Sequence, residues 1–256
     1  MITKILYTVH FDKDIISFLF SSKIAKTILL SKYPEFEKTF KSRQPFKNFV
    51  VSVLFRENKP LISSKNRKIV LKRNIPYRFY FTYIGEIPIE ILKPWKCKIF
   101  EANAVIRPLY MKSEYIDKIR LRKSPYYKID FITPTLLKIP GEKSSYYELY
   151  PNTYLVYHSI ISHWNKYTSP ELKIKINNIF EIWRKIRIIE QKIKVVKITY
   201  DQKTFKAFIG NIIVKIDDSM IENISRIFAY ANYIGIGKSR SIGFGQVNIT
   251  PITIKH

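Results

Sequence analysis

The sequence predicts an α+β fold class, in which antiparallel sheets carry helices on one face, and three observations lead to this prediction. The chain of 256 residues is 46% hydrophobic, which is enough apolar material to bury a core of ordinary size. Each half of the chain shows strand and helix patterns in the order β-α-β-β-α-β. A charged stretch without a clear period, residues 111–125, separates the two halves. Because this element order is the ferredoxin-like arrangement, we expect two ferredoxin-like (RRM-like) domains in tandem.

The first domain is expected over residues 1–115. Runs of β-branched and aromatic residues predict its strands, and apolar residues at spacings of three and four predict its main helix. The expected elements are a strand at 4–11, a helix at 15–32, a buried strand at 49–55, a basic hairpin arm or edge strand at 65–73, a strand at 77–84, a short helix at 88–92 and a strand at 97–109.

The second domain is expected over residues 126–256. Its last helix is predicted from the Asp-Asp-Ser sequence that precedes it, because such residues cap helix N-termini. The expected elements are a strand at 127–139 that Pro134 interrupts, helical regions at 153–166 and 174–187, strands at 192–200 and 204–216 with a turn at Asp201 and Gln202, a helix at 220–233 and a closing strand at 246–250.

The charge of the chain is its most unusual property. Its 45 Lys and Arg residues against 20 Asp and Glu residues give a formal net charge of +25. A surplus of this size attracts polyanions, and nucleic acid is the first partner to consider because neutralised phosphates release their counterions. A basic protein adapted to its solvent, or one that binds an anionic membrane surface, is the alternative interpretation.

The cysteine count and the length of the apolar runs indicate in which compartment the protein is expected. Cys97 is the single cysteine, so the chain forms no internal disulfide and offers no thiolate cluster for zinc. The N-terminus lacks the pattern of a signal peptide, and no apolar run reaches the roughly 18 residues of a membrane span. The sequence therefore predicts a soluble, cytoplasmic protein without a membrane partner.

Glycine is concentrated near the C-terminus. Four of the seven glycines stand within residues 235–245, which read GIGKSRSIGFG. The segment follows a predicted helix and precedes a strand, so it has the wrong order for a Rossmann fingerprint and the wrong spacing for a Walker loop. Two interpretations stay open. The glycines could let an RNA backbone approach the chain closely, or they could form a helix C-cap and a tight bend.

The same residues carry a resemblance to a known family. A helix that ends in YANYIGIG, followed by KSRS and IGFGQVNI, strongly resembles the C-terminal glycine-rich signature of the CRISPR-associated repeat-processing endoribonucleases, the sixth-numbered Cas proteins of the repeat-associated (RAMP) superfamily. DFITPTLLKI at 130–139, KAFIGNIIVKI at 206–216 and QPFKNFVVSVLF at 44–55 resemble further strands of that family. The resemblance spans most of the chain and implies tandem ferredoxin-like domains.

The resemblance implies a reaction. Members of this family cut repeat RNA without a metal ion or other cofactor. The 2′-hydroxyl next to the scissile phosphate attacks in line and leaves a 2′,3′-cyclic phosphate and a 5′-hydroxyl. Many members use a histidine between the first helix and the second strand, but residues 33–46 of this chain contain none. The SSK-x-x-K motif, which carries Lys23 and Lys26, resembles a histidine-free archaeal branch in which lysines of the first helix serve the cleavage step.

Three residues are therefore expected to be catalytic: Lys23, Lys26 and Arg240. Their charges would stabilise the pentavalent phosphate, and one lysine would donate a proton to the 5′-oxygen. CRISPR repeat RNA, as precursor crRNA, is the expected partner. The residues expected to bind it are Gly235, Gly237, Lys238, Ser239, Gly243, Gly245, Lys47, Lys68, Lys72 and Arg73.

Other interpretations of these residues stay open. Lysines on a helix are most often part of a solvated surface, and Tyr33 could replace the histidine as a proton shuttle or belong to the core. The missing histidine also fits a member that binds repeat RNA without cutting it, or a structural subunit of a CRISPR ribonucleoprotein. Association with effector-complex subunits and homodimer formation are open as well. The tryptophans, Trp95, Trp164 and Trp183, are expected in the core or at an interface.

Overall fold

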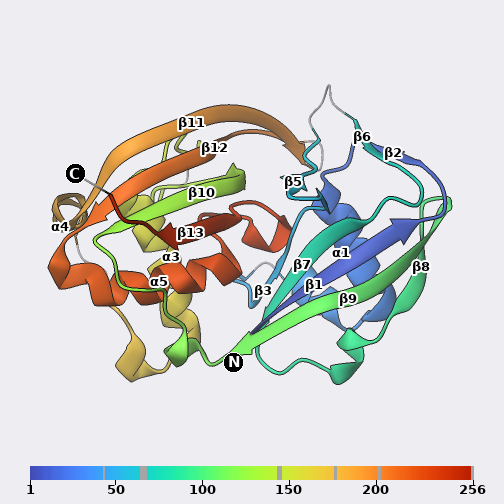
Figure 1. The fold of residues 1–256 in the computed structure, drawn as a ribbon, viewed down its shortest axis with the longest axis horizontal. Helices are drawn as coiled ribbons and strands as arrows, with labels where there is room; N and C mark the ends of the chain where they lie inside the picture. The colour runs from blue at the N-terminus through green and yellow to red at the C-terminus, as the bar shows by residue number, and fades with distance from the viewer. Residues whose placement is uncertain (43, 64–67, 143–145, 176–177, 201–202, 255–256) are drawn as a thin grey trace. The chain divides into compact units, whose positions relative to one another are not determined.

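The computed structural model describes residues 1–42, 44–63, 68–142, 146–175, 178–200 and 203–254 (Figure 1). The chain divides into two compact units. The first unit comprises Met1–Ser113 together with two short pieces from later in the chain, Lys197–Phe205 and Ser241–Gly243. The second unit comprises Glu114–Val196, Lys206–Arg240 and Phe244–His256.

A seven-stranded sheet forms the frame of the first unit. Its strand order is β5-β4-β7-β1-β9-β8, and β3 also pairs with β7. The order β9-β1-β7-β3 within it is that of a ferredoxin-like domain. The strands are β1 (Ile2–Phe11), β3 (Phe49–Val51), β4 (Phe55–Arg56), β5 (Lys59–Pro60), β7 (Tyr77–Ile84), β8 (Trp95–Ile99) and β9 (Ala102–Glu114).

Two helices, α1 (Ser21–Lys32) and α2 (Phe36–Lys41), cover one face of this sheet (Figure 1). Period-two alternation sends every second side chain of β1 and β7 to that face, where Tyr7 and Phe79 are fully buried. Their rings stack with centroids 5.1 Å apart. Burial of each such ring stabilises the fold by roughly 1.5–3 kcal/mol, so the aromatic alternation holds α1 in place.

The first helix is shorter than predicted, because it begins at Ser21 rather than at residue 15. Ile15–Ser17 is a strand, β2, which pairs with β6 (Ile69–Leu71) in a separate two-stranded sheet. The Ser17 hydroxyl accepts a hydrogen bond from the Leu19 backbone, and Ile16 is 63% exposed. The apolar spacing fits a helix, but two adjacent β-branched isoleucines and a partner strand favour the extended form.

Two other predicted strands of this unit are each divided. Residues 49–55 form β3 and β4, because the Ser52 hydroxyl accepts a hydrogen bond from the Tyr80 backbone and interrupts the regular pairing. Residues 97–109 lie in β8 and β9, which meet at a turn where Phe100 has a positive φ of 54°. The short helix predicted at 88–92 is the 3₁₀ helix Ile89–Leu92. Residues 65–67 of the predicted basic strand lie outside the described residues.

The second unit is built on a four-stranded sheet with the order β11-β12-β10-β13, again a ferredoxin-like order. Its strands are β10 (Tyr126–Thr135), β11 (Ile186–Tyr200), β12 (Lys203–Ile216) and β13 (Val247–Pro251), and its helices are α3 (Thr153–Tyr167), α4 (Ile179–Lys185) and α5 (Ile221–Ile234). Short 3₁₀ helices span Ile116–Lys118, Pro170–Leu172, Asp218–Met220 and Arg240–Ile242. The predicted α+β class and tandem ferredoxin-like arrangement are confirmed.

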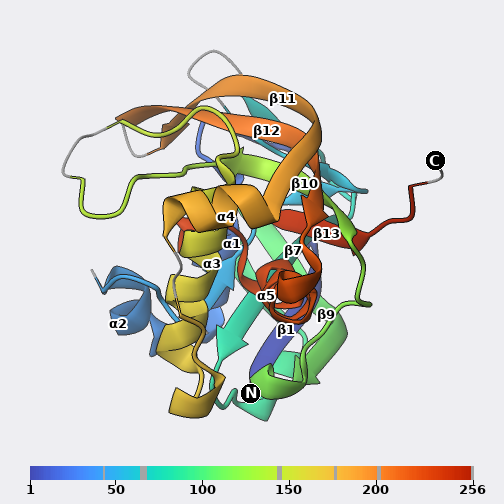
Figure 2. The same ribbon diagram turned by 90° about the vertical axis from the view of Figure 1, so that its left-hand side faces the viewer.

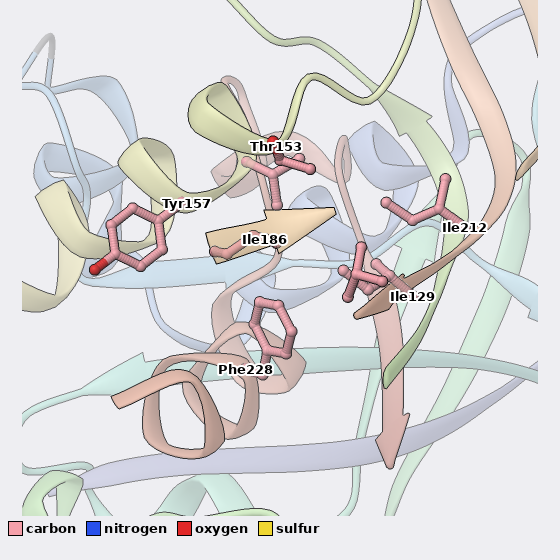
Figure 3. Close-up of a pocket in the computed structure, with 8 residues that line it drawn as sticks. Ile129, Thr153, Tyr157, Ile186, Ile212 and Phe228 are labelled. Atoms are coloured by element: carbon pink, nitrogen blue, oxygen red, sulfur yellow. The ribbon is translucent and has the colours of Figure 1, made fainter. Parts of the chain in front are cut away.

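Helices α3 and α5 pack on the sheet of the second unit, and Figure 3 shows a small gap between them and the strands. Ile129, Ile212 and Phe228 point into this gap, with Thr153 and Tyr157 at its edge. Its lining includes no charged group, so we interpret it as a packing defect of the core. The predicted turn at residues 201–202 lies outside the described residues. None of the described helices is both long and apolar enough to cross a membrane.

Candidate functional site

The two candidate catalytic lysines lie on the outer side of α1, in the first unit. Ile24, Ala25 and Ile28 fill the inner side of the helix. The Lys23 Nζ lies 4.9 Å from the ring centroid of Tyr200, and the Lys26 Nζ lies 5.5 Å from that of Phe40. Both side chains are partly buried. Aromatic rings therefore orient the two ammonium groups, while helical spacing keeps them on neighbouring positions of one face.

Lys47 lies far from Lys23 and Lys26 in the sequence, but the packing of α2 brings it near Lys26. Its Nζ donates a 2.7 Å hydrogen bond to the carbonyl oxygen of Phe40, the residue whose ring also carries Lys26. Burial lowers the pKa of Lys47, and the nearby charge of Lys26 lowers it further. The structure thus brings Lys26 to the ring and Lys47 to the backbone carbonyl of the same residue of α2, and the lowered pKa of Lys47 favours release of its proton.

Part of the glycine-rich segment lies against the beginning of α1. The Ser22 hydroxyl donates a 2.6 Å hydrogen bond to the Ile242 carbonyl oxygen. A Cβ on Gly243 would come within 2.8 Å of the Ser22 Cβ, and the backbone there has a φ of +88°. Residues 241–243 therefore stand one residue away from Lys23, within the first unit, and Gly243 is required for that approach.

The other glycines of the segment serve contacts inside the second unit. Gly235 ends α5, where its N–H bonds to the Ala231 carbonyl oxygen at 2.7 Å. The Ile236 N–H bonds to the Gly245 carbonyl oxygen at 2.7 Å, and a Cβ on Gly245 would lie 1.9 Å from the Ile236 oxygen. A Cβ on Gly237 would lie 2.4 Å from the Leu136 oxygen.

This geometry corrects the reason expected for Gly235, Gly237 and Gly245. The backbone that approaches them closely belongs to the chain itself, so the C-cap and tight-bend interpretation explains their presence. Their part in RNA binding stays a prediction, and it would consist of fixing the shape of the segment. Ser239, also predicted to bind RNA, has a positive φ of 60° and continues the bend.

Arg240 differs most from its predicted role. It was expected to contact phosphate, but its side chain is only 7% exposed. Its Nη1 donates long hydrogen bonds of 3.4 Å to the Ser159 and Gly235 carbonyl oxygens. Burial lowers its pKa to about 10, against the opposite influence of the Tyr230 and Tyr167 hydroxyls. The bend turns this side chain inward, so the structure assigns Arg240 an internal position rather than a phosphate contact.

Lys238 is exposed beside the bend, and its predicted contact with RNA stays a prediction. Its backbone N–H bonds to the Leu136 carbonyl oxygen at 2.8 Å, while its side chain is exposed. Burial of part of the side chain lowers its pKa, and the charge of Lys138 adds to this effect. Lys238 and Lys138 therefore place two positive charges beside the bend of the second unit.

The basic residues Lys68, Lys72 and Arg73 around β6 are exposed, and their contacts with RNA stay a prediction. The Lys68 Nζ lies 5.8 Å from the Phe18 ring centroid. Lys72 pairs with the Asp14 carboxylate at 3.1 Å, and the Arg73 N–H bonds to the same carboxylate at 2.7 Å. Because exposed ion pairs contribute little to stability, Asp14 does not prevent Lys72 from exchanging to a phosphate.

Tyr33 is a core residue and not a proton shuttle. It is buried among the aromatic side chains of the first unit, and burial raises its pKa to about 12. Its hydroxyl oxygen is buried as well, so it is not placed to exchange protons with a substrate. Within the described part of the chain, no group of three or more His, Cys, Asp or Glu side chains is placed to hold a metal ion.

Lys4 was not singled out in the sequence, although its pKa is strongly lowered in the folded protein. It lies on β1 with its Nζ 4.7 Å from the Tyr80 ring centroid, and burial, with a smaller effect of Lys112, lowers its pKa to about 8. The sequence did contain a signal for this residue, since Lys4 stands in a strand whose other residues are mostly apolar. Side chains of a central strand are surrounded by protein, so a lysine there is expected to be partly buried.

The free energy of unfolding should therefore depend on pH through Lys4. Its pKa falls from 10.5 to about 8 on folding, so the unfolded chain binds more protons between these values and stability rises with pH there. Replacing Lys4 with Met should remove this rise and stabilise the protein below pH 8, by roughly 3 kcal/mol at most. Urea unfolding of both proteins from pH 7 to 10.5 measures the difference. Parallel curves would contradict the lowered pKa.

The fold and the site together define a class: a tandem ferredoxin-like protein with a basic first helix and a glycine-rich segment beside it. The model of the Cas6 N-terminal domain matches residues 3–114, and the model of the CRISPR-associated endoribonuclease Cas6 matches residues 129–247. Together the two models span most of the chain. The chain therefore belongs to the Cas6 family of CRISPR-associated endoribonucleases. The resemblance seen in the sequence is confirmed, whereas its histidine-free branch stays a prediction.

Solved structures share the fold. Cas6 of Thermus thermophilus superposes with a TM-score of 0.70 at 13% identity, over 97% of this chain and 98% of that chain. A Cas6 product complex gives a TM-score of 0.67 at 16% identity, over 97% and 100% of the two chains. A Cas6-related protein from Pyrococcus furiosus gives 0.59 at 17% identity, over 97% and 98%. No curated protein sequence matches the chain.

Proposed function

We propose that this protein binds CRISPR repeat RNA and cleaves precursor crRNA without a metal ion. Membership of the Cas6 family supports an RNA-cleaving enzyme, and the formal net charge of +25 supports a polyanionic substrate. Two structures with the same fold are a Cas6 product complex and a RAMP protein binding different RNA substrates. The observation that carries the proposal is the cluster of Lys23, Lys26 and Lys47 around α1, beside a segment without histidine.

The proposed reaction is an internal transfer at one phosphate. The 2′-oxygen bonds to phosphorus, the bond from phosphorus to the 5′-oxygen breaks, and the 2′-proton passes to solvent water. Lys23 and Lys26 stabilise the charge of the pentavalent phosphate. Lys47, whose pKa burial lowers, or Lys26 beside it, supplies a proton to the departing 5′-oxygen. The products are a 2′,3′-cyclic phosphate and a 5′-hydroxyl.

The test uses a panel of end-labelled CRISPR repeat RNAs in buffer with EDTA. We expect one cut in the cognate repeat, with a product that ends in a cyclic phosphate by mass spectrometry. A 2′-deoxy substitution at the cut site should abolish the product, because it removes the attacking oxygen. Cleavage that EDTA abolishes would contradict a metal-independent reaction.

One observation favours a second candidate function. The lack of a histidine within residues 33–46 is also what a non-catalytic family member would show. Such a protein would hold crRNA, alone or with subunits of an effector complex. Tight binding of the cognate repeat with no cut under any condition would select this second function.

A further inference from the structure

A group of exposed aromatic and basic side chains on α4 and at the beginning of β11 has no part in the site described above. Phe180 is 71% exposed and Trp183 is 45% exposed, and their rings meet edge to face with centroids 6.0 Å apart. Arg184 and Arg187 are exposed as well. The Arg187 Nε donates a 3.2 Å hydrogen bond to the Arg184 carbonyl oxygen. We call Phe180, Trp183, Arg184 and Arg187 the aromatic–arginine stripe.

The sequence spacing explains why the stripe faces outward. Phe180, Trp183 and Arg184 follow one another at intervals of three and one within α4, which places them on one side of the helix. Arg187 follows in β11, where its hydrogen bond to the Arg184 carbonyl oxygen keeps it beside the end of α4. The opposite side of α4 carries Ile182, and Ile186 begins β11; both isoleucines are buried. Figure 2 shows α4 facing the viewer at the surface of the second unit. Since the isoleucines anchor the helix, the exposed rings contribute little to the core.

A side-chain cap and an ion pair within the helix stabilise α4, which carries three of the four members of the stripe. The Asn178 side chain caps α4 by accepting a 2.9 Å hydrogen bond from the Glu181 N–H. Glu181 also pairs with Lys185 at 2.9 Å, one turn later. A rigid pair of aromatic rings loses little conformational entropy when a flat ligand stacks on it.

Positive charge continues from α4 into a neighbouring groove. Lys185 lines this groove with the segment that follows α3 and with the beginning of α5. Its charged lining consists of Lys173, Lys175, Lys185 and Arg226 with the carboxylate of Glu171. Lys185 also pairs with Glu181 and Arg226 with Glu222, so Lys173 and Lys175 carry most of the positive charge that the groove offers. Cations beside exposed aromatic rings suit a ligand that has both negative charge and flat apolar faces, and a single-stranded polynucleotide has both.

We propose that the aromatic–arginine stripe binds a single-stranded stretch of the RNA substrate. Bases stack on Trp183 and Phe180, and the arginines and the lysines of the groove contact phosphates. The inference rests on the proposed function, because the RNA is the one that the protein is proposed to cleave. The contact is tolerant of sequence, since every base offers a flat face.

Tryptophan fluorescence provides a direct readout. Of the three tryptophans, Trp95 and Trp164 are buried, so Trp183 is the one that a base can reach. Adding a uridine homopolymer of single-stranded RNA, or the cognate repeat with its flanks, should quench the emission of Trp183. The Trp183→Phe variant should bind RNA with little loss and show no quenching, because phenylalanine also stacks.

Affinity and its salt dependence separate stacking from charge. Replacing Trp183 and Phe180 together with alanine should weaken binding of the homopolymer at least tenfold, while the slope of log K against log salt stays the same. Replacing Arg184 with alanine should reduce that slope by about one. The matched control is Tyr150→Ala, which removes a 54% exposed aromatic ring elsewhere in the second unit and should leave affinity unchanged.

The outcomes distinguish this inference from the proposed function. Cleavage of the repeat by the wild type, with no quenching and with wild-type affinity in the alanine variants, would overturn the inference alone. In that case the stripe would be a surface for a protein partner. If the wild type bound neither the homopolymer nor any repeat, the proposed function would fail together with the inference.

Discussion

A variant in which alanine replaces both Lys23 and Lys26 should cleave the cognate repeat roughly 10²–10⁴ times more slowly than the wild type. The Tyr200 and Phe40 rings hold the two ammonium groups in place, and the double variant would remove both from the face of α1 on which we propose the site. Their positive charge matters most when charge builds up on the phosphate. Affinity for the repeat should change much less, because many other lysines contribute to phosphate binding.

Single-turnover cleavage, with binding measured separately on a 2′-deoxy repeat, checks this prediction. The control is Lys32→Ala, which removes a lysine from the last turn of the same helix, on the side opposite to Lys23. It should cleave at the wild-type rate. Equal losses of rate in the control and in the double variant would show that general charge, rather than these two lysines, determines the reaction.

Conservative variants separate the two roles proposed for the cluster. Lys26→Arg keeps the charge but holds its proton too tightly to donate it, because arginine has a far higher pKa than lysine. If Lys26 acts through charge alone, this variant should retain most of the activity. If Lys47 is the proton donor, Lys47→Arg should be the slower of the two, with unchanged repeat affinity.

Most of the fold could be predicted, because local patterns and tertiary packing agree over most of the chain. Strand β7 has the predicted limits, since its alternating aromatic residues fit a half-buried strand and no other element. The main error, at Ile15–Ser17, arose where a helical spacing and a β-branched pair compete. Pairing with β6 decides that competition, and a partner strand is not visible in the local sequence.

The candidate site was predictable only where it depends on spacing along one element. Lys23 and Lys26 follow from helical periodicity, but the meeting of Lys26 and Lys47 at Phe40 depends on how α2 packs. The inward turn of Arg240 depends on bends whose direction is set by contacts with distant backbone, such as Ser159. Exposure of Trp183 likewise could not be foreseen, because tryptophan is more often buried.

Replacing Gly245 with alanine should destabilise the protein by more than about 4 kcal/mol, or prevent folding altogether. Gly245 has a φ of +66°, and a Cβ would lie 1.9 Å from the Ile236 carbonyl oxygen. That oxygen belongs to backbone that is itself held by the hydrogen bond from the Ile236 N–H to the Gly245 oxygen. Neither of these two backbone segments can move away without breaking the hydrogen bond between the Ile236 N–H and the Gly245 oxygen. The added methyl group therefore has no space. Urea unfolding, or the yield of folded protein, measures the effect.

Gly141 supplies the matched control, because it has a similar φ of +79° but nothing within 4 Å of its added Cβ. Gly141→Ala should therefore cost only the backbone strain, roughly 1–2 kcal/mol. The difference between the two variants isolates the close approach of the chain to itself. If Gly245→Ala were as stable as Gly141→Ala and yet bound the repeat poorly, the internal explanation of these glycines would be wrong. RNA, rather than backbone, would then be what approaches Gly245.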